Sequence, residues 1–205
     1  MSTRRSTDEV RALLLGAARE LFGAQGYDAT TTKQIAARAG VSEPLLFNHY
    51  GTKRQLFDAA ILGPFADLIE QYKAAWRSDL AESTSDLLVH DFVSRLFTLA
   101  RSNRSLLLSL ALNRAAGNRA EGTDLLDELA GLLQSLRELA PRMEDARLKH
   151  LDAPVTTAAV AGMVFGVALL DGLLFPSDMP PPGDGELIGE IATVTMHGIA
   201  HRESH

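Results

Sequence analysis

Apolar residues recur at intervals of three and four along most of the chain, which is the spacing of one face of an α-helix. The first such run consists of Val10, Leu13, Leu14, Ala17, Ala18, Leu21 and Phe22. Ser6 and Glu9 form a capping-box pair ahead of it, and we expect Gly23 and Gly26 to end it in left-handed turns. The pattern predicts a first helix of about 15 residues.

Two short helices separated by a turn follow. Thr31 opens a second capping box, and Gly40 is expected to end that helix. Ser42 is expected to cap the next helix, whose first turn tolerates Pro44 because the N–H that proline lacks would have no partner there. The pattern therefore predicts a helix-turn-helix whose second helix runs from Glu43 to Tyr50.

The rest of the chain is also predicted to be helical, since no alternating run is long enough to indicate a strand. A fourth helix opens at Thr52, and we expect Pro64 to kink it. The later helices are expected at Asp86–Arg101, Arg104–Ala116, Thr123–Leu139, Val155–Phe175 and Glu186–His201. The predicted fold class is all-α, with about nine helices by this reading.

One stretch, Ala153 to Leu170, carries no charge and is close to the minimum of about 17 residues that crosses a membrane. It begins with Pro154, is rich in Ala and Gly, and is followed at once by Asp171. These features favour a buried helix packed closely on another helix. We therefore expect no membrane-spanning segment.

Composition excludes several classes of protein. The chain has 205 residues, a formal net charge of -6 and 46% hydrophobic residues, which is typical of a globular protein rather than a disordered one. It has no cysteine, so disulfides, thiolate zinc sites and cysteine nucleophiles are excluded. The first ten residues do not resemble a signal peptide. A cytoplasmic location is expected.

Charge is unevenly distributed along the chain. Residues 1–57 contain eight basic and five acidic side chains, a balance of +3, whereas the remainder carries -9. Such asymmetry is typical of a nucleic-acid-binding head on a non-binding body, although an uneven surface charge without function produces it too. We place the predicted domain boundary here, with a DNA-binding domain at 1–57; the family resemblance given below implies that 58–205 is an effector-binding and dimerisation domain.

The run TTTKQIAARAGVSEPLLFNHYGTKRQLF, Thr30 to Phe57, resembles the DNA-binding signature of the TetR/AcrR family of transcriptional regulators. The preceding ARELFGAQGYDATTT, Ala18 to Thr32, resembles the helix and turn before it. The resemblance covers roughly residues 8 to 60 and implies a three-helix DNA-binding domain containing the helix-turn-helix. Phe47 departs from the pattern, because the family usually has tyrosine there.

The helix Glu43 to Tyr50 is short enough to lie across a major groove. Its Glu43 can accept a hydrogen bond from cytosine N4, and its apolar residues can pack on thymine methyl groups. The residues predicted to face bases are Glu43, Pro44, Leu45 and Phe47. The residues predicted to hold phosphates, through hydroxyls or positive charge, are Thr31, Lys33, Tyr50 and Lys53.

Other chemistry finds little support. There is no nucleophile elbow, zinc-protease motif or phosphate-binding loop, so we expect no enzyme, no cofactor and no metal site. His197, His201 and His205 share a helical face, but a solvated terminal segment explains them better. Asp171 is expected to pair across a subunit interface or to face water; contact with a cationic effector is the alternative.

The resemblance implies a homodimer that binds a palindromic operator in double-stranded DNA and responds to a small-molecule effector. We expect the last two helices to form a four-helix interface with their two-fold mates, where Gly162 and Gly166 permit close approach. An apolar effector is the default for a Leu-rich body. It would change the separation of the DNA-binding heads through the kink near Pro64. A repressor is favoured over an activator; the alternatives are a regulator without an effector and a helical enzyme.

Overall fold

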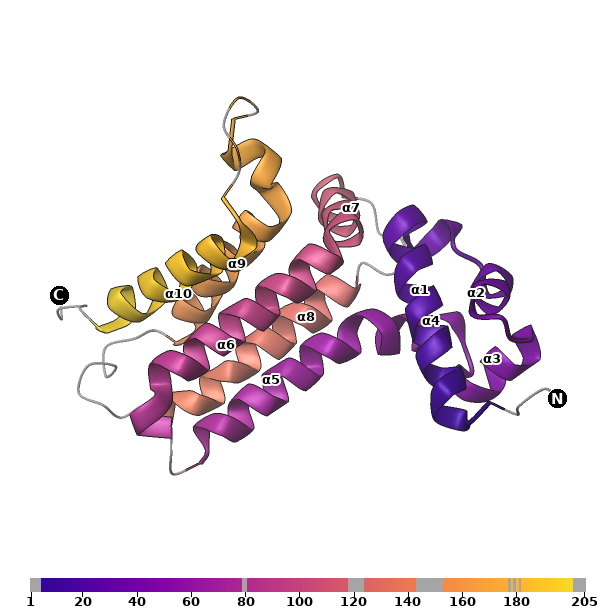
Figure 1. Cartoon of the computed structure of the whole chain (residues 1–205), viewed down its shortest axis with the longest axis horizontal. Coiled ribbons are helices and arrows are strands. Elements are labelled where there is room, and N and C mark those ends of the chain that lie inside the picture. Colours follow the sequence, from indigo (N-terminus) through magenta and orange to yellow (C-terminus); the bar gives the residue numbers. More distant parts are fainter. Residues whose placement is uncertain are drawn as a thin grey trace. The chain divides into compact units, whose positions relative to one another are not determined.

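The computed structural model describes residues 5–78, 81–117, 124–142, 153–176, 178, 180 and 182–200. Every regular element within these ranges is a helix, which confirms the predicted all-α class (Figure 1). The helices are α1 (Thr7–Ala29), α2 (Thr32–Ala39), α3 (Glu43–Tyr50), α4 (Lys53–Phe57), α5 (Gly63–Trp76), α6 (Ala81–Ser102), α7 (Arg104–Ala115), α8 (Asp124–Gln134), α9 (Ala153–Leu174) and α10 (Asp184–Ala200). A π-helical turn, Asp58–Leu62, joins α4 to α5, and a 3-10 helix, Ser135–Arg142, follows α8.

The chain divides into two compact units. The N-terminal unit comprises Met1–Pro64 and Asn103–Glu128, and the C-terminal unit comprises Phe65–Ser102 and Leu129–His205. Helix α7 and the start of α8 therefore pack with the N-terminal helices, although they follow the predicted boundary at Phe57. The division by function, into 1–57 and 58–205, stays a prediction.

Helix α1 begins as predicted and ends later than predicted. The Ser6 hydroxyl accepts a hydrogen bond from the Glu9 N–H at 3.2 Å, and the Glu9 carboxylate accepts one from the Ser6 N–H at 2.6 Å. The hydrogen bond from that Ser6 N–H lowers the pKa of Glu9. Gly23 was predicted to stop the helix, but it lies inside α1; only Gly26 takes a positive φ, of 79°. The helix resumes after Gly26 and continues to Ala29.

Three aromatic rings explain why α1 continues. Tyr27 stacks on Phe22 with ring centroids 5.7 Å apart, and both meet Phe57 of α4 edge to face, at 4.8 and 4.9 Å. Such pairs are worth about 0.5–1.5 kcal/mol each beyond the area that they bury, so the two pairs that Tyr27 makes together offset the cost of about 1 kcal/mol for a glycine inside a helix. Burial of Tyr27 therefore keeps the chain helical past Gly23.

The helix-turn-helix follows the predicted residues with one exception. Thr31 and Gln34 form the expected capping box, and Gly40 ends α2 in the left-handed conformation with a φ of 65°. Ser42 was predicted to cap α3 with its side chain, but it makes no such bond. Pro44 has no N–H to offer, and the Leu45 N–H binds the Ser42 carbonyl instead, at 3.1 Å.

The predicted interruption at Pro64 takes the form of a π-helical turn just before it. The Gly63 N–H bonds to the Asp58 carbonyl, five residues back. Proline lacks an N–H and its ring crowds the preceding turn, so a widened turn is a common way for a helix to accommodate it. The helix then runs on through α5 to Trp76.

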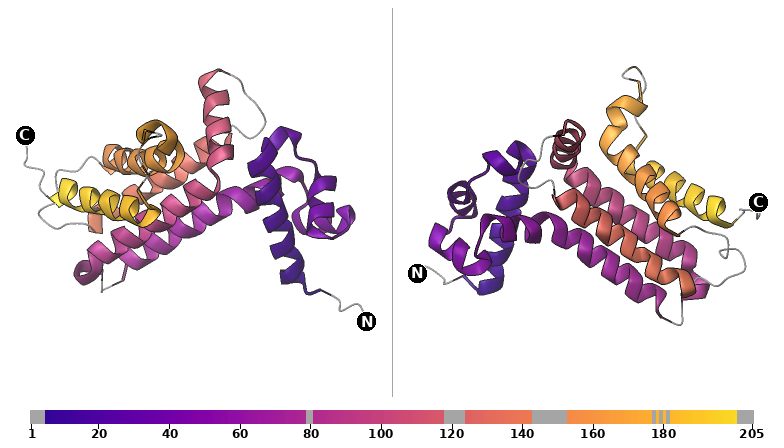
Figure 2. Two further views of the ribbon diagram at one scale, coloured as in Figure 1. Left: turned by 45° about the horizontal axis from the view of Figure 1, so that its top comes forward. Right: turned by 180° about the vertical axis from the view of Figure 1, so that it is seen from behind.

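The C-terminal unit is built around α6. Tyr72 of α5 stacks on Phe92 of α6 at 4.3 Å, and the two helices lie side by side (Figure 2). Helices α9 and α10 both pack on α6 as well. One helix of the described residues, Pro154–Leu174, is long and apolar enough to cross a membrane by length and composition, with a mean hydropathy of 1.9. Helix α9 packs on another helix, α6, as expected, but only 17% of that window is buried within the chain.

The two N-caps give a matched stability test. Thr31→Ala removes a side-chain cap, so we expect the free energy of unfolding to fall by about 1 kcal/mol. Ser42→Ala removes a hydroxyl that caps nothing, so we expect a change within about 0.5 kcal/mol. Urea unfolding followed by circular dichroism measures both. Equal losses in the two variants would contradict this assignment of the caps.

Candidate nucleic-acid interface

Helix α3 presents one narrow face to solvent. Leu46 is fully buried and Tyr50 is 7% exposed, so these two residues anchor the helix to the core of the N-terminal unit. Pro44, Phe47 and Asn48 are exposed, with Phe47 at 41%. Spacings of three and four place these three side chains together on the opposite face. The surface available to a duplex on α3 therefore consists of an apolar pair and one amide.

Asn48 was not among the residues predicted to face bases. The sequence does indicate that Asn48 shares a helical face with Pro44, because the two residues are four apart. The prediction instead followed the first turn of the helix, and so it included Leu45. Leu45 is only half-exposed and packs against the core of the N-terminal unit.

Glu43 is held by the helix-turn-helix itself. The Thr32 hydroxyl at the start of α2 donates to the Glu43 carboxylate at 2.6 Å, and Glu43 is half-buried. The side chain thus ties the N-terminus of α3 to that of α2. A hydrogen bond from cytosine N4 to Glu43, as predicted, would have to compete with this hydrogen bond from Thr32.

Tyr50 was predicted to hold a phosphate, and the structure corrects that prediction. Its hydroxyl is enclosed, and among the described residues no hydrogen-bond partner lies in reach. The Arg11 guanidinium lies 5.6 Å from the centre of its ring. Because the ring faces the core, Tyr50 contributes packing rather than a contact to DNA.

The predicted phosphate contacts Thr31, Lys33 and Lys53 lie outside α3. Thr31 and Lys33 are exposed at the start of α2. Lys53, in the first turn of α4, is half-exposed with its ammonium 4.1 Å from the centre of the Tyr27 ring. Arg5 donates to the Gly40 carbonyl at 2.8 Å, which brings the chain before α1 onto the turn of the motif. These groups provide positive charge at three places in the N-terminal unit.

A shallow groove of about 620 Å³ lies elsewhere in the same unit, along α1 and α2. Its floor is formed by Leu13 and small residues, and its charged side chains are already engaged. Arg38 and Glu20 pair at 2.7 Å, Arg5 binds the Gly40 carbonyl, and Glu9 belongs to the capping box. The groove therefore offers an apolar strip rather than free polar groups.

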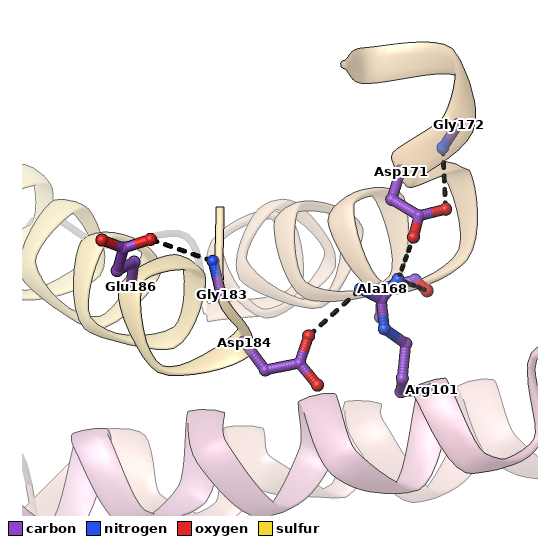
Figure 3. Close-up of polar contacts among 7 residues, drawn as sticks. All are labelled: Arg101, Ala168, Asp171, Gly172, Gly183, Asp184 and Glu186. Atoms are coloured by element: carbon purple, nitrogen blue, oxygen red, sulfur yellow. Dashed lines mark hydrogen bonds and ion pairs between the residues drawn. The ribbon is translucent and has the colours of Figure 1, made fainter. Parts of the chain in front are cut away.

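Asp171 pairs within its own chain, although we expected a subunit contact or solvent. Its carboxylate lies 2.6 Å from the Arg101 guanidinium of α6, and Arg101 also reaches Asp184 at 3.1 Å and the Ala168 carbonyl at 3.2 Å (Figure 3). Helix α9 is kinked at Leu170, with φ -116° and ψ 23°. Arg101 thus binds the Ala168 carbonyl, and the Asp171 carboxylate accepts from the Gly172 N–H at 2.7 Å, both at the kink where the helical hydrogen bonds are distorted.

Lys73 carries a buried charge in the C-terminal unit. It is 5% exposed, and its ammonium pairs with Glu70 at 2.8 Å and Glu138 at 3.1 Å. The hydrogen bond to Glu70 raises the pKa of Lys73. Because both Lys73 and Arg101 are neutralised by carboxylates of their own chain, neither is a ready partner for an anionic ligand.

The enclosed hydroxyl of Tyr50 gives a direct test of its role. Burying a hydroxyl without a partner costs about 1–3 kcal/mol. We therefore expect Tyr50→Phe to raise the free energy of unfolding by about 1 kcal/mol, with no loss of affinity for duplex DNA. Thermal melting and a DNA-binding titration check the two halves. Weaker DNA binding by a stable Tyr50→Phe protein would instead support the predicted contact between the Tyr50 hydroxyl and a phosphate.

Comparison with known proteins supports the resemblance seen in the sequence. Residues 14–60 match the model of the bacterial regulatory proteins of the tetR family. The HTH-type transcriptional activator FasR of Mycolicibacterium smegmatis is 39% identical over 71 residues, which are 35% of this chain and 32% of that protein. An HTH-type transcriptional repressor of Mycobacterium tuberculosis is 43% identical over 70 residues, 30% of this chain and 37% of that protein. The alignments thus span about a third of these curated relatives.

A solved structure extends the likeness in fold to nearly the whole chain. The fatty acid degradation regulator FadR of Bacillus halodurans superposes with a TM-score of 0.63 at 14% identity, covering 98% of this chain and 100% of that one. At this identity the likeness concerns the fold alone. The family model locates the resemblance at residues 14–60, which include α2, α3 and α4. Over residues 14–60 the chain is therefore similar to the tetR family of bacterial regulatory proteins.

Proposed function

We propose that this chain is a sequence-specific DNA-binding transcriptional regulator, acting in the cytoplasm as a homodimer on a palindromic operator. The exposed face of α3 carries this proposal. A short helix is held by Leu46 and Tyr50 so that Pro44, Phe47 and Asn48 project from the surface, and Lys33 is exposed at the start of α2. This is the arrangement by which a helix-turn-helix enters a major groove. Two such helices in a dimer would reach half-sites about 34–36 Å apart or somewhat more.

The dimer is supported by the surface of the C-terminal unit. Large apolar side chains are exposed on α9 and α10, among them Leu173 at 79%, Val155 at 61% and Val194 at 45%. A Cβ added at Gly162 or Gly166 would meet nothing within 4 Å. An apolar surface lined with open glycines suits close packing of a second helix pair. We therefore propose that α9 and α10 form a four-helix interface with the same helices of a second copy.

A small-molecule effector completes the proposal. An apolar ligand is favoured, because Lys73 and Arg101 are already paired with carboxylates in the C-terminal unit. Binding would alter the fit to the operator through the helix that passes the π-helical turn and Pro64. Repression is favoured, since a ligand that disfavours the DNA-binding conformation releases the operator. We propose neither catalysis nor a cofactor for the chain.

The DNA-binding proposal is tested by selecting bound duplexes from a random pool with the whole protein. We expect a two-fold palindrome whose binding weakens steeply with salt. Lys33→Ala should weaken binding to every sequence by a similar factor and lower the salt slope by about one. Arg95→Ala removes the same charge from the C-terminal unit and serves as the control, with unchanged binding. Failure of the protein to enrich any sequence would refute the proposal.

The interface is tested by filling a glycine on α9. Gly162→Leu meets open space in a single chain, so we expect its secondary structure to persist while the dimer dissociates. Gly131→Leu on α8 is the matched control, because a Cβ there also meets nothing within 4 Å. Sedimentation without detergent measures the oligomeric state. A Gly162→Leu protein that stays dimeric, or a wild type that requires detergent, would contradict the proposed interface.

A further inference from the structure

The composition of α3 restricts the bases that it can recognise. Its sequence, EPLLFNHY, contains no lysine or arginine. A lysine or arginine that binds O6 and N7 of guanine is the commonest specific contact in the major groove. Helix α3 cannot make that contact, and His49 on the same helix is only half-exposed. Guanine recognition would have to come from outside α3.

The residue that suits cytosine is also compromised. Glu43 could accept from cytosine N4, but it is half-buried and already accepts from the Thr32 hydroxyl at 2.6 Å. Using Glu43 for a base would weaken the hydrogen bond that joins the first turns of α2 and α3. Helix α3 is therefore poorly suited to bind either base of a G·C pair.

The exposed face of α3 matches an A·T pair instead. Phe47 and Pro44 are apolar, and the apolar group on the major-groove edge is the thymine methyl. Asn48 lies beside them, and its amide offers one donor and one acceptor, which match N7 and N6 of adenine. Residues three and four apart on one face reach neighbouring bases together.

We propose that α3 reads A·T base pairs, with Phe47 and Pro44 on thymine methyl groups and Asn48 on adenine. The inference rests on the proposed function, because it requires a specific operator. Affinity and specificity are then divided between different elements. Lys33 and Lys53, on α2 and α4, attract the backbone of any duplex, whereas the uncharged exposed face of α3 chooses among sequences.

The methyl contacts are tested on the selected operator by replacing each thymidine of a half-site with deoxyuridine, one at a time. This removes the methyl group and keeps the base pair. A buried methyl is worth about a fourfold change in affinity, so we expect losses of about that size at the thymines under α3. Phe47→Ala should bind more weakly and lose most of its sensitivity to the replacement.

The adenine contact is tested by a cycle that pairs Asn48→Ala with 7-deazaadenine, which lacks the N7 acceptor. Each change alone should weaken binding by about 5- to 150-fold, and the two together little more than one. Lys33→Ala with 7-deazaadenine is the control, and there the two losses should multiply. Equal melting temperatures of the variants show that the fold is kept.

Two results would overturn the inference, and only one of them would also refute the proposed function. An operator that is selected clearly, yet is insensitive to deoxyuridine and to Asn48→Ala, would refute A·T reading and leave the regulator proposal intact. Enrichment of no sequence by a folded protein would refute both.

Discussion

Burial of Leu46 fixes which face of α3 meets solvent. A helix turns by about 100° per residue, so once Leu46 and Tyr50 are sunk in the core, Pro44, Phe47 and Asn48 must project on the other side. That core is itself held by the aromatic rings joining α1 to α4, and these rings hold Tyr27, in the helical segment that follows Gly26, against the rest of the unit. The recognition surface therefore follows from packing in the interior, which contains none of the residues that would touch DNA.

The C-terminal unit has more apolar surface than its own core covers. Helix α9 is apolar on most faces and largely exposed, and the leucines after its kink are exposed too. Arg101 binds Asp171 and the Ala168 carbonyl, and so stabilises the kink from which these leucines project. A second copy covering this surface would account for it, which is why dimerisation and the shape of α9 are linked in our proposal.

Charge serves different purposes in the two units. In the C-terminal unit, Lys73 and Arg101 are satisfied by carboxylates of their own chain and stabilise local structure. In the N-terminal unit, Lys33 is exposed at the start of α2, and Lys53 lies over an aromatic ring with part of its surface in solvent. Because α3 itself has no lysine or arginine, our proposal assigns attraction to the DNA backbone and choice of sequence to separate helices of the weakly basic N-terminal unit.

Local sequence determined the helices and most of their ends. Ser6 with Glu9, Thr31 with Gln34, and Gly40 act through neighbours three or four residues away, so their roles could be predicted from spacing alone. The family resemblance could be recognised for the same reason, because it lies in one continuous segment. The exposed position of Asn48 follows from the same helical spacing, because it lies one turn after Pro44.

Tertiary structure decided what spacing cannot express. Gly23 stays helical because Tyr27 packs on rings from two helices, and Tyr50 is core because Leu46 and its neighbours enclose it. Asp171 forms an ion pair with Arg101, which lies seventy residues away in sequence. Such contacts form only when distant segments meet, and the free energy of burial then outweighs local preference. The sequence alone determined the helical class and the family resemblance of the N-terminal segment, whereas packing determined which side chains remain free to bind.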